Sequence, residues 1–251
     1  MLVAGAFVIS TNHVLGRFVI NDIPPLGLAF WRVAIGAIVL LPFAWRELVA
    51  KRQVIIDNWK LFLAIAFVFM PLGNAAVYLA YNFTTAINGA VIATAQPAFT
   101  MFLAWFVLRQ TVTPMQALGI AIAALGVLVI ITRGELSALT TMSFGGGDLI
   151  MLVGTVGFAI YTVLVRRVPP EIGPMLILVV VQLFGAATMA PLYIAESLIY
   201  LPIPLTWEAL FVLLWLGTAI AVVAVGLNNM VILTLGPNKA SIGHYLRAVF
   251  I

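Results

Sequence analysis

The chain is a succession of apolar runs, each about 20 residues long, separated by short stretches with charged residues, proline, glycine or asparagine. A helix needs about 20 apolar residues to cross the hydrocarbon core of a bilayer. Of the 251 residues, 64% are hydrophobic and only 8% are charged, whereas a soluble domain is about half apolar and about a quarter charged. The sequence therefore predicts an integral membrane protein built of helices.

The apolar runs predict the positions of the spanning helices. Their approximate ranges are 2–19, 26–45, 60–81, 88–108, 115–132, 148–166, 174–195, 207–228 and a ninth from about 236 to the end of the chain. The connections are short, and none is long or polar enough to form a domain outside the membrane.

The basic residues predict the orientation in the membrane. If the N-terminus lies in the cytoplasm, only Arg17 and Arg133 fall in outside loops. The inside set is Arg46, Lys51, Arg52, Lys60, Arg109, Arg166, Arg167 and Lys239. Cytoplasmic loops carry the excess of Lys and Arg, so we expect a cytoplasmic N-terminus. The net charge of +4 therefore reflects membrane topology and not a nucleic-acid-binding patch.

The sequence also contains an internal repeat. When residues 14–47 are aligned without gaps on residues 163–196, ten of the 34 pairs are identical. Apolar composition alone explains matched Val or Leu, but not the matched polar, glycine and proline residues. Those pairs are Arg17/Arg166, Pro25/Pro174, Gly36/Gly185, Pro42/Pro191 and Glu47/Glu196.

The repeating unit contains five predicted helices, and this odd number determines the topology. Two tandem copies of such a unit cross the membrane in opposite directions, as in many secondary transporters whose binding site lies near the midplane. We expect a first repeat over residues 1–133 and a second over residues 148–251. The predicted fold is an all-α polytopic membrane protein, a ten-helix inverted-repeat (5+5) transporter bundle. The second copy stops about 33 residues short of the first, so we expect about nine helices here, without the C-terminal one.

Short motifs within the two predicted repeats resemble the EamA family of the drug/metabolite transporter superfamily. They are Pro25 with Phe30-Trp31-Arg32, Ala95-Gln96-Pro97-Ala98-Phe99, Gln116-Ala117-Leu118-Gly119, and Asn238-Lys239-Ala240-Ser241 leading to Tyr245-Leu246-Arg247-Ala248-Val249-Phe250. Two positions depart from the family pattern. This chain has Arg109-Gln110 in place of the usual Gly-Glu, and Arg247-Ala248 in place of a frequent Glu-Pro.

The resemblance covers essentially the whole chain as two repeats, the second incomplete. It implies a multi-pass protein of the bacterial plasma membrane that carries small metabolites, often outward, driven by protons or by exchange. It does not name a substrate.

Polar side chains inside the predicted spans indicate where a transport pathway would run, because in hydrocarbon each needs a partner. Asn74, Tyr78, Tyr81 and Asn82 have the spacing of one helix face. We interpret them as the lining of a cavity, and hydrogen bonding between helices is the alternative. Gln96 precedes Pro97, which would kink the fourth helix; a kink that only improves packing stays an alternative.

Two further groups complete the candidate substrate-binding residues. Asn12 and His13 belong to a run of four polar residues in the first helix, where His13 either relays protons or serves only in packing. Arg32 either binds an anionic group of the substrate or extends to the membrane surface beside Trp31. The full set is Arg32, Asn74, Tyr78, Gln96, Asn12 and His13, with no catalytic or metal-binding residue.

The leading hypothesis is a membrane secondary transporter that exports a small metabolite by alternating access. The alternative is a truncated EamA-like fragment without transport activity that is retained as an interacting membrane protein. An enzyme is not expected, because G-x-S-x-G, H-E-x-x-H and paired aspartates within a span are missing from the sequence. We expect no cofactor. The expected partners are a small-molecule metabolite and the lipid bilayer, without nucleic acid, and a homodimer is left open.

Overall fold

The computed structural model describes residues 8, 11, 23–131, 145–199, 203, 204 and 206–241. Helix is the only regular secondary structure in these ranges. The elements are α2 (Pro25–Ala50), α3 (Arg52–Asp57), α4 (Trp59–Phe67), η1 (Val68–Ala75), α5 (Ala76–Ala80), α6 (Ala86–Ala93), α7 (Gln96–Leu108), α8 (Pro114–Ile131), α10 (Gly146–Val165), α11 (Pro174–Ile199), α12 (Trp207–Trp215), η2 (Leu216–Ala224), α13 (Val225–Leu235) and α14 (Pro237–Ser241).

Six helical segments among the described residues are long and apolar enough to cross a membrane. They are Pro25–Ala50, Trp59–Ala80, Val91–Leu108, Gly146–Val165, Pro174–Ile199 and Trp207–Leu235. With α8, a shorter apolar helix, they correspond to the predicted second to eighth helices. The chain is therefore an all-helical, multi-pass membrane protein, as predicted. The first predicted helix and most of the ninth lie outside the described residues.

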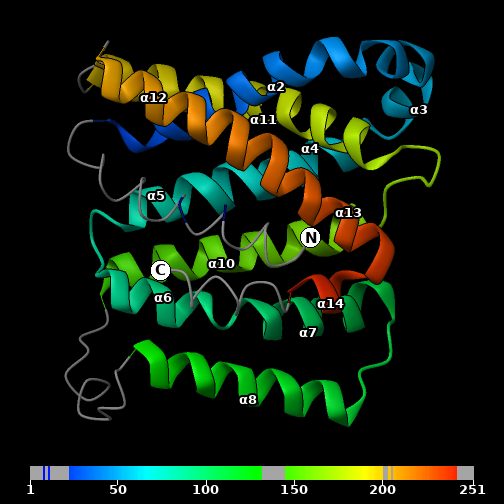
Figure 1. Ribbon diagram of the computed structural model, residues 1–251, viewed down its shortest axis with the longest axis vertical. Helices are drawn as coiled ribbons and strands as arrows, with labels where there is room; N and C mark the ends of the chain where they lie inside the picture. The colour runs from blue at the N-terminus through cyan, green and yellow to red at the C-terminus, as the bar shows by residue number, and fades with distance from the viewer. Residues whose placement is uncertain are drawn as a thin grey trace.

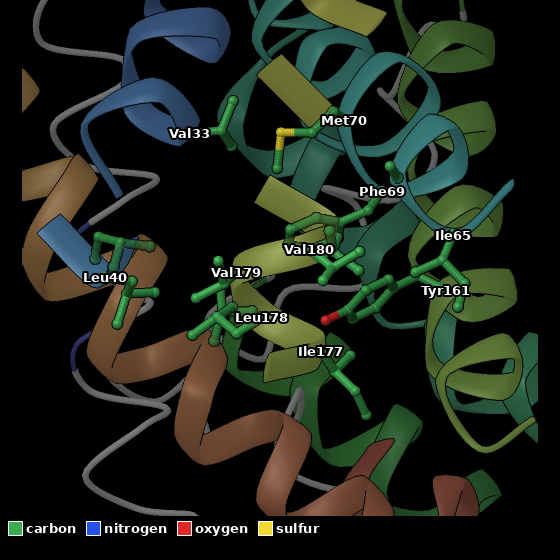
Figure 2. Packing of buried hydrophobic residues seen from close by; sticks show 14 of the residues in the cluster. Val33, Leu40, Ile65, Phe69, Met70, Tyr161, Ile177, Leu178, Val179 and Val180 are labelled. Atoms are coloured by element: carbon green, nitrogen blue, oxygen red, sulfur yellow. The ribbon is translucent and has the colours of Figure 1, made fainter. Parts of the chain in front are cut away.

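The helices form a bundle in which α2 and α11 pack along each other (Figure 1). Segment η2 packs on α2, and α4 packs on α11. Further out, α10 packs on η1, α5 and α7, and α8 lies at the edge of the bundle (Figure 1). Figure 2 shows the apolar interior, where Ile177, Val179 and Val180 of α11 lie near Met70 and Tyr161.

The ends of α2 and α11 establish that these two helices run antiparallel. Glu196, near the end of α11, accepts hydrogen bonds from the backbone N–H groups of Leu26 (3.1 Å) and Gly27 (2.7 Å) in the first turn of α2. At the other end of the pair, Glu47 lies close to the start of α11, since a Cβ added at Gly173 would be 3.7 Å from its Oε1. Each carboxylate therefore lies at the positive N-terminal end of the opposite helix.

The element boundaries follow the offset seen in the sequence. Helix α2 spans residues 25–50 and α11 spans 174–199, a shift of 149 at both ends. Helix α4 begins at residue 59 and α12 at residue 207, and each passes into a π-helical segment, η1 over 68–75 and η2 over 216–224. The order α-helix, π-helix, α-helix therefore occurs once in each half of the described chain.

Three local features differ from plain apolar helices. The fourth predicted helix, where a kink at Pro97 was expected, is interrupted at residues 94–95 between α6 and α7, and Pro97 lies in the first turn of α7. The π-helical segments were not predicted, because their 8 and 9 residues are fewer than the window of about 11–18 residues in which apolar periodicity is identified. The helix predicted to end at residue 228 continues to Leu235.

Side-chain hydrogen bonds tie four helix ends to one face of the bundle, which we call the basic face. Lys51, directly after α2, donates to the carbonyl of Glu171 in the connection before α11. After α10, Arg167 donates to the carbonyl of Val107 in α7 at 2.8 Å, and Arg166 donates to that of Leu233 in α13. Basic residues at the ends of α2 and α10 therefore lie on the same face, which is the distribution that orients membrane proteins.

Candidate functional site

Arg32 is the charged residue at the centre of the candidate site. It lies on α2 and is only 3% exposed. Its Nη1 donates a hydrogen bond to Oδ1 of Asn74 and a second, of 3.2 Å, to the hydroxyl of Tyr78. The structure therefore brings together three of the six predicted site residues, and the side chain does not extend to the membrane surface.

The π-helical segment η1 holds Asn74 in the orientation that Arg32 needs. The side-chain Nδ2 of Asn74 donates to the backbone carbonyl of Phe69, five residues earlier, at 2.7 Å. A π-helix widens the backbone and leaves carbonyls available to side chains, which is one reason such segments occur at functional sites. Pro71 in the same segment has no N–H to donate. With its amide held by Phe69, Asn74 presents its oxygen to the guanidinium.

A second buried polar pair lies on the other side of Phe69. The hydroxyl of Tyr161, on α10, donates to Oδ1 of Asn229, on α13, at 2.5 Å. The Tyr161 ring stacks on the Phe69 ring with centroids 4.1 Å apart. Figure 2 shows Tyr161 among apolar side chains, with its oxygen directed away from Ile65. Polar groups of α2, η1, α10 and α13 thus form one connected centre.

Two amide atoms near this centre have no hydrogen-bond partner among the described residues. They are Nδ2 of Asn229, whose side chain is 0% exposed, and Oε1 of Gln182, whose side chain is 1% exposed. Gln182 lies on α11 and donates through Nε2 to the carbonyl of Ala221 in η2 at 2.9 Å. A buried amide group without a partner costs about 1–3 kcal/mol, so each such atom calls for an explanation.

The other predicted site residues have different positions. Gln96 is 4% exposed in the first turn of α7, which packs mainly on α10 and α14 and not on α2. Tyr81 and Asn82 follow the end of α5, where Tyr81 is half-buried and Asn82 is exposed. The predicted polar face of this helix is therefore limited to Asn74 and Tyr78. Asn12 and His13 lie outside the described residues.

A separate polar cluster surrounds Asp148 at the start of α10. Its carboxylate accepts hydrogen bonds from the side chains of Thr84 and Asn88 and, at 2.7 Å, from the backbone N–H of Gly145. These contacts cap the helix and join it to the turn before α6. The cluster is accounted for by this structural role. The described residues also contain no group of His, Cys, Asp and Glu that could hold a metal ion.

Sequence reasoning missed Tyr161, Gln182 and Asn229. Each lies within an apolar run with at most one polar neighbour, and so few polar residues give no periodic signal. The helix predicted over residues 207–228 ended before Asn229. The available signal was the cost of an amide in hydrocarbon, which predicts a partner on another helix.

The sequence of the chain is similar to those of known transporter proteins. A sequence model of the EamA-like transporter family matches residues 1–132. The chain is similar to the "Uncharacterized transporter YyaM" of Bacillus subtilis (strain 168), with 29% identity over 189 residues, or 75% of this chain and 62% of the relative. It is also similar to the "Uncharacterized transporter YetK" of the same organism, with 25% identity over 212 residues, or 82% of this chain and 64% of the relative. The chain thus spans less than two thirds of the length of these relatives.

The fold is shared with solved structures. A chain described only as "Crystal structure of protein" superimposes with a TM-score of 0.72 over 99% of this chain and 84% of its own length. The sequence identity is 16%, so the likeness concerns the fold alone.

Proposed function

The chain belongs to the EamA-like transporter family, and from that premise we propose that it carries a small anionic metabolite across the membrane by alternating access. The group formed by Arg32, Asn74 and Tyr78 is the observation that carries this proposal. Membership in a transporter family also favours a carrier over an enzyme.

The chemistry of Arg32 supports an anionic substrate. An arginine at the centre of a bilayer costs about 2.5–3.5 kcal/mol on insertion scales, so buried arginines of membrane proteins tend to be functional. Asn74 and Tyr78 are neutral acceptors, and they orient the guanidinium without cancelling its charge. A planar guanidinium binds a carboxylate or phosphate through two parallel hydrogen bonds.

The polar pair on the opposite side of Phe69 supports a second contact to the same substrate. The Tyr161 hydroxyl donates a hydrogen bond to Oδ1 of Asn229, and the Asn229 Nδ2 has no acceptor among the described residues. A substrate oxygen placed there would remove the cost of the buried N–H groups. We therefore propose a substrate with one anionic group for Arg32 and a hydrogen-bond acceptor for Asn229.

The packing of the two halves supports alternating access. We propose an inverted pair of five-helix repeats, with residues 1–133 and 148–251 as the two units; the antiparallel α2 and α11 are what such an inversion requires. In each half, a glycine of the long helix lies close to the π-helical segment of the other half. A Cβ at Gly36 of α2 would lie 2.0 Å from Oε1 of Gln182 in α11 and 3.1 Å from the carbonyl of Gly217 in η2. A Cβ at Gly185 of α11 would lie 2.8 Å from Met70 in η1. Rocking at these close crossings would open the centre to one face and then to the other.

Location and direction complete the proposal. We propose that the basic face is cytoplasmic in a bacterial plasma membrane, with the N-terminus on that side, because Lys and Arg accumulate there. Export as the direction rests on the family resemblance.

Transport by proteoliposomes tests the proposal. Purified protein would be reconstituted and assayed for uptake of radiolabelled small carboxylates and phosphate monoesters. For an accepted anion, Arg32→Gln should reduce uptake about tenfold or more, since a hydrogen bond to a charged group contributes about 1.5–3 kcal/mol. Asn74→Asp should also reduce it, because the new carboxylate would compete for the guanidinium. Arg52→Gln, at an exposed position on α3, is the matched control and should transport normally.

Two outcomes would contradict the proposal. Equal uptake by the wild type and Arg32→Gln would remove Arg32 from the site. Uptake of none of these anions by correctly inserted wild-type protein would favour the alternative of a non-transporting membrane protein.

A further inference from the structure

A surface hollow lies at the end of α7, away from the central site. It has a volume of about 490 Å³ and is lined by Trp105, Phe106, Arg109, Gln110, Thr111 and Val112. The lining combines two aromatic rings and one cation, and contains no acidic residue. Its composition is suited to a ligand that has both an apolar part and a negative charge.

The position of the hollow relates it to the membrane interface. Helix α7 completes the apolar segment Val91–Leu108, so its end is the point where the chain leaves the hydrocarbon core. Along the helix, Phe102, Trp105 and Phe106 are exposed, with 58%, 54% and 71% of their surfaces accessible. The rings of Phe102 and Phe106 are stacked, and that of Trp105 lies beside Phe102. These three exposed aromatic side chains form an apolar surface along α7, and two of them, Trp105 and Phe106, line the hollow.

Two arginines lie near the end of α7. Arg109 is exposed in the hollow, and its backbone has φ 53° and ψ 31°. Among the described residues it is the only non-glycine residue with a positive φ. Arg167 is exposed as well, and its Nη2 donates to the carbonyl of Val107, two residues before Arg109. Arg109 therefore lines the hollow together with Trp105 and Phe106, and Arg167 is hydrogen-bonded to the last turn of the same helix.

We propose that this hollow binds the headgroup of an anionic phospholipid. The phosphate would lie against Arg109 in the hollow, and the acyl chains would follow Phe102, Trp105 and Phe106 toward the bilayer centre. Basic residues at this level attract anionic lipids by about 1 kcal/mol each. Trp105 has the amphipathic ring that is enriched at the interface.

The site is independent of the transport centre, and binding alone tests it. The full chain would be reconstituted in nanodiscs of phosphatidylcholine, and spin-labelled phosphatidylglycerol would be titrated in. Loss of one interfacial cation converts to about a fivefold weaker affinity, so Arg109→Asn should weaken binding about fivefold. Asn is chosen because it tolerates the left-handed backbone. Arg109→Lys retains the charge and should stay within about twofold of the wild type, and Arg52→Asn, on α3, should bind normally.

Several results would overturn the proposal. One is unchanged phosphatidylglycerol affinity in Arg109→Asn, and another is equal affinity of spin-labelled phosphatidylcholine for the wild type. Displacement of the lipid by inorganic phosphate at comparable concentration would assign the hollow to a soluble anion. Failure of Arg109→Asn to fold would show as loss of its helical circular dichroism, and Arg109→Gln would then replace it.

Discussion

Replacement of Glu196 by alanine tests whether the carboxylate at the end of α11 holds the start of α2. Glu196 is 8% exposed, and its two oxygens accept from the Leu26 and Gly27 N–H groups at 3.1 and 2.7 Å. These N–H groups lie in the first turn of α2, where a helix supplies no acceptor of its own. In Glu196→Ala both would lose their partner.

The magnitude follows from these two bonds. A hydrogen bond to a charged group contributes about 1.5–3 kcal/mol. The Gly27 N–H is buried and would lose this in full, whereas the Leu26 N–H is part-buried and water would replace part of its bond. We therefore expect Glu196→Ala to lower the free energy of unfolding by about 2–4 kcal/mol. Glu196→Gln keeps one acceptor oxygen in place and should cost about half as much.

The repeat supplies a matched control. Glu47 occupies the equivalent position at the end of α2, but its side chain is 37% exposed and forms an ion pair with Lys51 at 2.6 Å. An exposed ion pair contributes about 0.2–1 kcal/mol, so Glu47→Ala should cost no more than that.

Unfolding by SDS in mixed micelles, followed by circular dichroism and by fluorescence of the six tryptophans, would measure all three variants. If Glu196→Ala were as stable as Glu47→Ala, the antiparallel contact of α2 with α11 would be refuted.

Three further substitutions and one control, Gly119→Ala, test other parts of the structure, with thermal unfolding in detergent as the measurement. Gly36→Ala should lower stability by about 1–3 kcal/mol through overpacking, because the added Cβ would lie 2.0 Å from Oε1 of Gln182 and 3.1 Å from the carbonyl of Gly217. Gly119→Ala, which has nothing within 4 Å, should not, and equal destabilisation of both would contradict the close crossing. Arg109→Gly should raise stability by about 1 kcal/mol, since glycine adopts the positive φ without strain; a lower stability would show that the arginine side chain contributes more than its backbone costs. Tyr161→Phe should lower stability by about 1–2 kcal/mol through loss of its 2.5 Å hydrogen bond to the amide on α13, and an unchanged midpoint would contradict that bond.

Most of the bundle could be predicted from apolar run lengths. The run from 174 to 195 lies within α11, and its counterpart from 26 to 45 lies within α2. The π-helical segments could not be predicted, because their formation depends on tertiary packing and not on periodicity. Met70, in η1, illustrates this dependence, since it lies against Gly185 of another helix.

The candidate site was predicted in part. Arg32, Asn74 and Tyr78 stood out because an arginine and a repeated polar spacing are unusual in a span. Neither the sequence of α2 nor that of the next span, taken alone, indicates that Arg32 contacts Asn74 and Tyr78. Asn229 was missed because its partner, Tyr161, lies 68 residues earlier, and a single sequence does not indicate which distant helices meet.

Cysteine accessibility at the centre of the bundle tests alternating access most directly. The chain contains no cysteine, so Asn229→Cys would carry a single thiol at a position that is 0% exposed. We expect membrane-impermeant thiol reagents to label it slowly from each side of sealed vesicles, and a transported anion to slow the labelling. Leu118→Cys on α8, which is 55% exposed on an apolar helix, should stay unlabelled because lipid surrounds it. Labelling of Asn229→Cys from one side only, or from neither, would contradict a carrier that exposes this centre alternately to the two faces.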